Sequence, residues 1–185
     1  MAEAAQNEST SLADLFAYLD GLTEPARVID LWDRIEHLEI GLDEVAEHVR
    51  FSPHHYLRNL VREGAHYHAL VICWHSGQRS PIHNHAGSAC GVKVISGVAT
   101  ETGFRATPSG LLKPSVTRDL APGAACVSVD TDTHQVSNLQ APGRDLVTLH
   151  VYSPPLLRMD TYSLVDSRVG VFIPSSFNFS EGGGI

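Results

Sequence analysis

Short apolar or alternating segments fill the chain from Ser52-Pro53 almost to its end, and they constrain the fold more than any other feature. Strand side chains alternate between two faces, so such segments, separated by Gly/Pro turns at 108–110, 122–123 and 142–143, predict β-strands. The expected strands span residues 56–61, 67–74, 91–95, 98–104, 115–120, 124–129, 135–139, 146–152 and 161–165. Such a density of short strands predicts a mainly β domain, either a sandwich or a small barrel.

The N-terminal part of the chain has a different, helical periodicity. Apolar residues recur at three- and four-residue intervals over 12–22 and again over 28–38, and Thr23 with Pro25 predicts a helix start capped by Thr23. We expect these apolar stripes to pack on the sheet rather than to bind a cofactor. The expected organisation is a frayed N-terminus (1–10), a helical extension (11–50), one β-barrel domain (51–180) and a flexible tail (181–185).

Composition excludes several classes of partner. The formal charge is −8, and no block of Lys and Arg occurs, so we expect neither nucleic acid nor an anionic membrane as a partner. The chain has no apolar run long enough to span a bilayer, and its first residues do not resemble a signal peptide. Cys73, Cys90 and Cys126 show no C-x-x-C spacing, which fits a reducing cytoplasm. We expect a cytoplasmic monomer.

Three histidines predict a metal site. His83 and His85 stand two residues apart, so on a strand both would project from one face while Asn84 points away. If His134 comes in from a second strand, three neutral nitrogen donors would hold a first-row metal and leave its opposite side open. That arrangement predicts an enzyme, and acid should weaken its metal binding because protonated imidazoles do not bind metal.

The spacing of these histidines resembles the motifs of the cupin superfamily. Gly77, five residues, His83-Asn84-His85, four residues, Cys90, six residues and Gly97 follow the first cupin motif, except that Cys90 replaces a glutamate ligand. The segment 134–138 resembles the end of the second motif. The resemblance implies a small jelly-roll-like β-barrel with a three-histidine metal site in its mouth. Without the carboxylate, Fe(II) keeps a net charge of +2, which favours binding of an anionic thiolate.

A closer resemblance, to the cysteine dioxygenase family, covers residues 56–162. The matching segments are Tyr56-Leu57-Arg58-Asn59-Leu60-Val61, Cys73-Trp74, Ser80-Pro81-Ile82-His83-Asn84-His85, Cys90, His134 and Leu149-His150-Val151-Tyr152-Ser153-Pro154-Pro155. This resemblance implies Fe(2+) as the cofactor, with L-cysteine and O2 as substrates. It further implies that both oxygen atoms are added to the sulfur, giving cysteine sulfinic acid.

The same resemblance implies roles for the other site residues. Arg58 would pair with the substrate carboxylate; Tyr56 would either assist Arg58 or be a packed aromatic. His150 would also face the substrate, and Thr148, His150 and Tyr152 would form a hydroxyl–His–Tyr relay on one strand face, with Tyr152 donating on the oxygen side. The alternative is that His150 and Tyr152 are a cross-strand pair in the core.

Cys90 has two possible registers. In one group of family members, a cysteine at this position forms a thioether with the active-site tyrosine, here Tyr152. Bacterial members often carry glycine there, and a shift of one residue would put Gly91 at the site and turn Cys90 to the other face. The count from His83 to Gly97 favours Cys90.

Other functions compatible with these motifs remain. A dioxygenase for a related thiol such as 3-mercaptopropionate is one, although that relative usually carries glutamine at the position of Arg58. A non-catalytic metal-binding cupin and a zinc or manganese isomerase of the same fold are the others. The absent glutamate ligand and the segment 152–155 favour a thiol dioxygenase over both.

Overall fold

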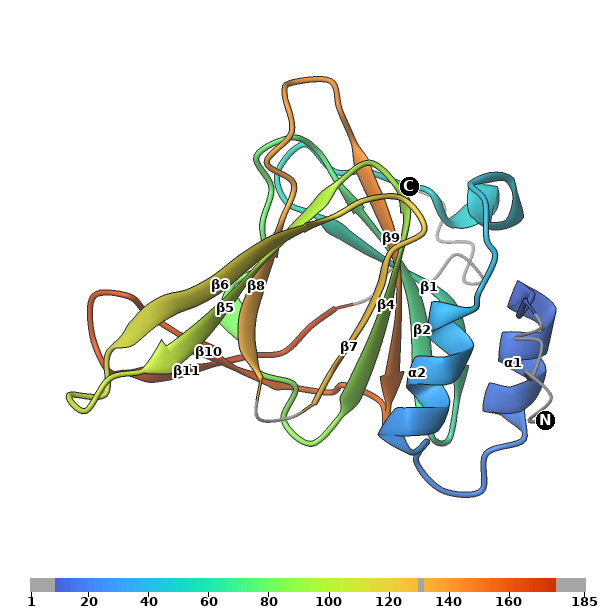
Figure 1. Ribbon diagram of the computed structural model, residues 1–185, viewed down its shortest axis with the longest axis horizontal. Helices are drawn as coiled ribbons and strands as arrows, with labels where there is room; N and C mark the ends of the chain where they lie inside the picture. Colours follow the sequence, from blue (N-terminus) through green and yellow to red (C-terminus); the bar gives the residue numbers. More distant parts are fainter. Residues whose placement is uncertain (1–8, 130–131, 176–185) are drawn as a thin grey trace, which may run out of the picture.

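Two antiparallel sheets packed face to face form the body of the protein, as the computed structural model shows for residues 9–129 and 132–175 (Figure 1). The first sheet has the order β1 (Leu57–Gly64), β2 (Tyr67–Trp74), β9 (Leu146–Ser153), β4 (Ala89–Ser96) and β7 (Ala125–Ser128). The second has the order β11 (Val169–Phe172), β10 (Met159–Tyr162), β3 (Ile82–His83), β8 (Thr133–Ser137), β5 (Ala99–Ala106) and β6 (Leu112–Leu120). The predicted mainly β, jelly-roll-like fold is confirmed, as two sheets rather than one closed barrel.

Strand β9 separates two packed layers. All eight of its residues are buried, and their side chains alternate between the two faces of the first sheet. Residues 147, 149 and 151 pack in the layer that the helices cover, whereas residues 146, 148, 150 and 152 point between the sheets. The polar residues Thr148, His150 and Tyr152 therefore reach the interior from a strand that is otherwise aliphatic.

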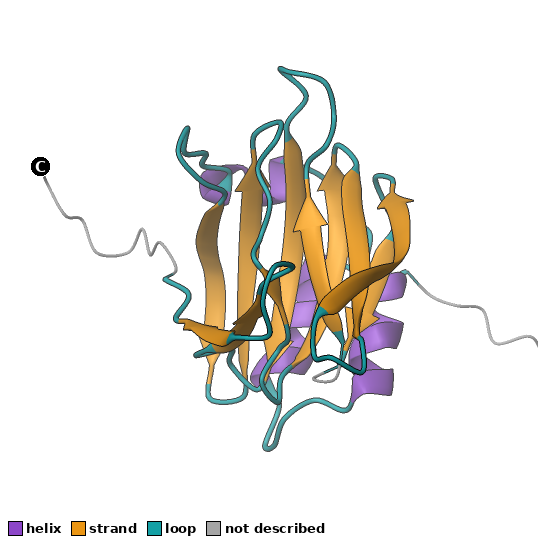
Figure 2. Cartoon of the chain, turned by 90° about the vertical axis from the view of Figure 1, so that its left-hand side faces the viewer, coloured by secondary structure: helices purple, strands orange, loops and turns teal. Residues whose placement is uncertain are grey.

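Two helices cover the outer face of the first sheet (Figure 2). They are α1 (Leu12–Asp20) and α2 (Val28–Glu36), followed by a short 3-10 helix, η1 (Asp43–His48). Ser11 and Asp14 form a reciprocal capping box at the start of α1. The predicted cap at Thr23 is wrong: α2 begins at Val28, after a backbone N–H at Ala26 donates to the Ser153 hydroxyl at 2.8 Å. This tie to β9 delays the start of the helix.

Gly91 lets α2 lie directly on β4. A Cβ atom at this position would lie 2.9 Å from Ile35 Cγ1 and 3.2 Å from Leu31 Cγ, closer than ordinary van der Waals contact. Gly91 therefore faces the helix. Because neighbouring strand residues point to opposite faces, Cys90 faces the interior between the sheets, where it is 1% exposed.

The strand predictions located nine of the strands but missed β3 and β11. β3 contains two residues, too few for any periodic pattern, and β11 is an exposed edge strand. The predicted ends, 1–10 and 181–185, lie largely outside the described residues, and the domain limits stay predictions. Thr10 is described and pairs with Leu38. Within the described residues, no helix is long and apolar enough to cross a membrane.

Candidate metal centre

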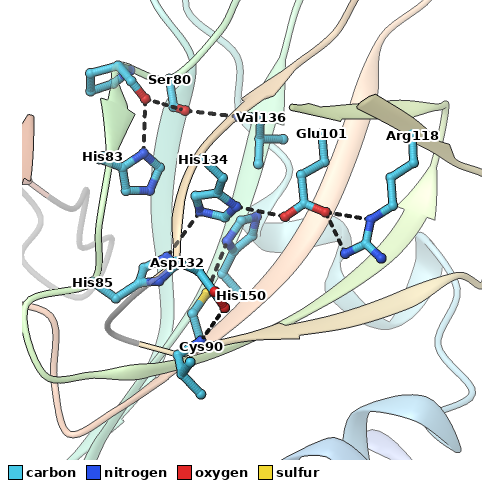
Figure 3. Close-up of polar contacts among 12 residues, drawn as sticks. Ser80, His83, His85, Cys90, Glu101, Arg118, Asp132, His134, Val136 and His150 are labelled. Atoms are coloured by element: carbon cyan, nitrogen blue, oxygen red, sulfur yellow. Dashed lines mark hydrogen bonds and ion pairs between the residues drawn. The ribbon is translucent and has the colours of Figure 1, made fainter. Parts of the chain in front are cut away.

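Pairing of β3 with β8 brings the three histidines together (Figure 3). His83 lies opposite His134 in the ladder, and the Ser80 backbone N–H donates to the Val136 carbonyl at 2.9 Å just before β3. Strand β3 ends at His83, so His85 lies in the following turn, yet its ring centroid is 5.3 Å from that of His83. The side chains of His83 and His85 therefore lie close together, as predicted, although the strand ends at His83.

The side chain of Asn84 points away from the histidines, as the alternation predicts. Its Nδ2 donates to the Tyr162 hydroxyl at 3.2 Å, and its Oδ1 accepts from the Asp160 backbone N–H at 3.1 Å. These bonds join the turn after β3 to the neighbouring strand β10. Asn84 thus holds the turn that carries His85 without entering the site.

The three imidazoles present nitrogen atoms to one point. One ligand atom from each of His83, His85 and His134 lies within 4.8 Å of the others, and the Nε2 atoms of His85 and His134 are 3.3 Å apart. That separation is about what two nitrogens show when both bind one ion at about 2.1 Å. A buried pair of facing nitrogens with a third imidazole beside them fits a first-row metal better than a purely structural cluster.

The other ring nitrogens fix which atoms are free to bind. His83 Nδ1 donates to the Pro81 carbonyl at 2.9 Å, and His134 Nδ1 lies 2.7 Å from a Glu101 carboxylate oxygen. Both arrangements leave Nε2 as the ligand atom. Burial, followed by the electrostatic interaction with the neighbouring His134, lowers the pKa of His83 to about 3 and that of His85 to about 2. These two imidazoles are therefore neutral near pH 7, the form that binds metal.

A buried hydrogen-bonded chain reaches the same cavity from β9. Thr148 Oγ1 is 3.0 Å from His150 Nε2, and His150 Nδ1 is 3.3 Å from the Tyr152 hydroxyl. Burial lowers the pKa of His150 and raises the pKa of Tyr152, so both are neutral near pH 7. Trp74 extends the chain, because its indole N–H donates to Thr148 Oγ1 at 3.1 Å. Sequence reasoning assigned Trp74 no role, since this contact depends on the pairing of β2 with β9.

Arg58 places a buried positive charge on the wall of the cavity. Arg58 is 7% exposed, and within the described residues its Nε has no hydrogen-bond partner and the residue forms no ion pair. The guanidinium carbon lies 5.3 Å from the centroid of the Tyr152 ring, a cation–π contact. Tyr56 stacks on Trp74 with centroids 4.4 Å apart, and it also lines the cavity, so both interpretations of Tyr56 stand.

These side chains line one cavity with an empty volume of about 330 Å³ including its mouth. A larger hollow of about 1120 Å³ lies beside it and shares Tyr56 and Arg58 as lining residues. Phe172 from β11 and Pro81 form part of that outer hollow. The two cavities therefore meet at Tyr56 and Arg58, and the inner one is lined by the three histidines.

The register of β4 places Cys90, not Gly91, beside Tyr152. Cys90 and Tyr152 are direct partners in the β4–β9 ladder, and Cys90 Sγ lies 4.0 Å from His150 Nδ1. Burial raises the pKa of the Cys90 thiol, so it is protonated near pH 7. Of the two registers open in the sequence, the structure has the one with Cys90 facing the cavity.

Sequence reasoning missed Glu101 and Arg118, which reach the metal centre through His134. Glu101 lies on β5 and contacts both His134 and Arg118 of β6. Sixteen residues lie between Glu101 and Arg118 in the sequence. Neither residue belongs to a motif that would mark it as part of a site. The contact follows from the pairing of β5 with both β6 and β8, which the sequence does not reveal.

Comparison with known proteins agrees with this geometry. The family model for cysteine dioxygenase type I matches residues 1–165. Cysteine dioxygenase type 1 of Bos taurus is 32% identical over 167 residues, covering 86% of this chain and 81% of the relative. The Homo sapiens protein of the same name is 31% identical with the same coverage. A double-stranded beta-helix protein from Klebsiella pneumoniae superposes with a TM-score of 0.52 at 20% identity, covering 70% of this chain and 87% of that one, which shows a shared fold. With this fold and these relatives, the chain belongs to the cysteine dioxygenase type I family.

Proposed function

We propose that the protein is an Fe(II)-dependent dioxygenase that oxidises L-cysteine with O2 to cysteine sulfinic acid. Family membership supports a thiol and O2 as substrates, and the three-histidine cluster supports a metal cofactor. We also propose that it works as a cytoplasmic monomer, without a nucleic-acid or membrane partner, in keeping with its formal charge of −8.

The observation that carries the proposal is the buried Arg58, which has no ion pair among the described residues and lines the same cavity as the three histidines. A buried charge without a counterion is unfavourable, so an anionic ligand would complete this site. The carboxylate of cysteine is planar and matches a guanidinium through two parallel hydrogen bonds. With the carboxylate held there, the thiol end of a short amino acid would extend toward His83, His85 and His134.

These three histidines would hold the iron, which when bound lowers the thiol pKa and allows electrons to pass from sulfur to dioxygen. The buried walls formed by Ile72, Val136 and Met159 would exclude water from the reacting sulfur. No external reductant is required, because the sulfur loses four electrons and the two oxygen atoms gain them. Both oxygens end on sulfur, and the sulfinic acid keeps the thiol proton.

The relay on β9 would leave the Tyr152 hydroxyl free to donate into the cavity. Trp74 donates to Thr148 Oγ1, and the Thr148 hydroxyl has two acceptors within reach, His150 Nε2 at 3.0 Å and the Ile72 carbonyl oxygen at 3.3 Å. If Thr148 donates to His150 Nε2, the imidazole proton sits on Nδ1 and donates to the Tyr152 oxygen. Tyr152 then directs its own O–H at the oxygen atoms of the substrate or product.

We further propose a thioether between Cys90 Sγ and the Tyr152 ring. Their direct pairing in the β4–β9 ladder supports it. Formation would remove one hydrogen from the thiol and one from the ring, with dioxygen accepting the two electrons. The link would fix the ring and so the direction of the Tyr152 hydroxyl.

The test is anaerobic loading of the apoprotein with Fe(II), followed by oxygen uptake with L-cysteine and mass detection of the product. We expect one molecule of cysteine sulfinic acid for each molecule of O2 consumed. Zinc-loaded protein serves as the control and should consume no oxygen. Equal or faster turnover of 3-mercaptopropionate would overturn the cysteine assignment, and absence of thiol-dependent uptake by iron-loaded protein would overturn the dioxygenase assignment.

A further inference from the structure

One of the three histidines has a charged partner behind it. His134 Nδ1 is 2.7 Å from Glu101 Oε1, and the other oxygen of the same carboxylate accepts from Arg118 Nε at 2.7 Å and pairs with Arg118 Nη2 at 2.6 Å (Figure 3). The Glu101 side chain is 9% exposed, whereas that of Arg118 is 54% exposed. A guanidinium at the protein surface therefore holds a buried carboxylate against a buried imidazole.

The strand register makes this arrangement rigid. Glu101 lies directly opposite Arg118 in the β5–β6 ladder. In the β5–β8 ladder, Glu101 is opposite Val136, so His134 is its diagonal neighbour two residues along. The three side chains thus share one face of three adjacent strands, and the backbone ladders on both sides of β5 fix their separation.

The hydrogen bonds define the charge and the proton positions. The Arg118 guanidinium donates from Nε to Glu101 Oε2 at 2.7 Å and has Nη2 2.6 Å from the same oxygen, a pairing that favours the ionised carboxyl group. Glu101 is therefore a carboxylate, which accepts hydrogen bonds and donates none. The proton in the bond between the two residues therefore belongs to His134 Nδ1, so the neutral form of His134 has its free lone pair on Nε2, which lies 3.3 Å from His85 Nε2.

The two other histidines lack such support. His83 Nδ1 is held by the neutral carbonyl of Pro81, and among the described residues no carboxylate is hydrogen-bonded to His85 Nδ1. The three histidines therefore differ, because only His134 has a carboxylate partner among the described residues. Cys90 stands where the cupin motif has a glutamate that binds the metal. In this protein the carboxylate of Glu101 contacts the imidazole of His134 instead of occupying that ligand position.

We propose that Glu101, anchored by Arg118, is a positioning residue that sets the tautomer and ring orientation of His134 for metal binding. The inference rests on the proposed three-histidine metal site and deepens it. A carboxylate hydrogen-bonded to a ligating imidazole raises the basicity of the ligand, and loss of such a partner typically weakens metal affinity by about 10- to 100-fold. Arg118 keeps the carboxylate aimed at His134 and balances its charge.

Glu101→Gln tests this directly, because it removes the charge while keeping the size of the side chain. Asp119→Asn is the matched control: Asp119 pairs with Thr100 on the adjacent rung of the same ladder and accepts from its hydroxyl at 2.6 Å. Each apoprotein is titrated anaerobically with Co(II) against a competing chelator, using the visible band of the bound ion. We expect about 10- to 100-fold weaker binding in Glu101→Gln and a wild-type affinity and band in Asp119→Asn.

Two further measurements separate positioning from folding. Urea unfolding of the apoproteins should give Glu101→Gln and Asp119→Asn similar stability, and Arg118→Gln should show a smaller loss of Co(II) affinity than Glu101→Gln. Long-range proton–nitrogen NMR of the wild-type apoprotein should find His134 protonated at Nδ1. Wild-type Co(II) affinity in Glu101→Gln, or a His134 proton on Nε2 in the wild-type protein, would overturn the inference.

These outcomes are distinct from those of the proposed function. Co(II) binding that depends on Glu101 in a protein without thiol-dependent oxygen uptake would support the positioning role and reject the dioxygenase assignment. Full oxygen uptake together with unchanged Co(II) affinity in Glu101→Gln would do the reverse.

Discussion

Replacing Arg58 with glutamine removes the buried positive charge from the cavity wall and leaves a polar side chain in its place. If Arg58 pairs with the substrate carboxylate, the variant must bind that carboxylate with an amide alone. We expect kcat/KM for L-cysteine to fall by about 100-fold, chiefly through a higher KM, because the carboxylate is held equally in the ground and transition states.

The magnitude follows from burial. Arg58 is 7% exposed and forms no ion pair within the described residues, so a carboxylate bound there would be its counterion in a largely water-free site. Removing one partner of a buried, hydrogen-bonded charge pair costs about 2–5 kcal/mol. Glutamine still donates a hydrogen bond, so a value near the lower end applies, about 2.7 kcal/mol, which corresponds to about 100-fold.

The assay compares two substrates at an oxygen electrode with iron-loaded protein. L-Cysteine carries the carboxylate, and cysteamine is the same aminothiol without it. The wild-type protein should prefer cysteine, and Arg58→Gln should lose that preference because its cysteine activity falls while its cysteamine activity does not. Arg58→Lys should give an intermediate loss, since an ammonium keeps the charge without the paired donors.

Iron content, measured on the same samples, should be unchanged, because Arg58 contacts none of the three histidines through a described hydrogen bond. An equal loss with cysteine and cysteamine would refute the carboxylate assignment and point to the packing of Arg58 on Tyr152. Loss of iron would refute it as well, and would make Arg58 a residue that supports the fold.

Three other predictions concern packing, the thioether and pH. Gly91→Ala should lower the free energy of unfolding by about 1–3 kcal/mol in urea, because its methyl group would overlap buried α2 side chains; an unchanged midpoint would contradict the packing of α2 on β4. Peptide mass mapping after turnover should show a crosslinked species lacking two hydrogens in wild-type protein and none in Cys90→Ser; an identical pattern in both would exclude the thioether. Burial lowers the pKa of His83 to about 3 and that of His85 to about 2, against about 6.5 when unfolded. The unfolded chain therefore takes up protons first, so stability of the apoprotein should be full above about pH 6.5 and decline toward pH 3. A flat stability curve between pH 7 and pH 4 would contradict buried, neutral imidazoles.

Much of the fold follows from local patterns. The strand predicted over 67–74 coincides with β2, which has an apolar run over 69–74, and β9 differs by one residue at its end, because apolar residues alternate along it at 147, 149 and 151. β3 was missed because its two residues are strand only by virtue of their neighbours, β8 and β10. The start of α2 was misplaced because a hydrogen bond to Ser153, far along the chain, holds Ala26 outside the helix.

The candidate site divides in the same way. Side chains with an inherent chemistry and a fixed spacing, such as His83 with His85 and Thr148 with His150 and Tyr152, could be recognised from the sequence. His83, His85, His150 and Tyr152 line one cavity, and Thr148 contacts His150 behind it. Spacing of two residues works because alternation along an extended backbone is a local property.

The sequence by itself determined a mainly β chain with helices at its start, a three-histidine cluster, and a set of residues resembling those of cysteine dioxygenases. The spacing of the motif favoured Cys90 over Gly91 at the cavity, and the tertiary structure decided it, because Gly91 lies against α2 and Cys90 pairs with Tyr152. It also brought Glu101 and Arg118 behind His134. Contacts across three strands depend on which strands pair and in which register. The alternation of residues within one strand does not specify its partner strand.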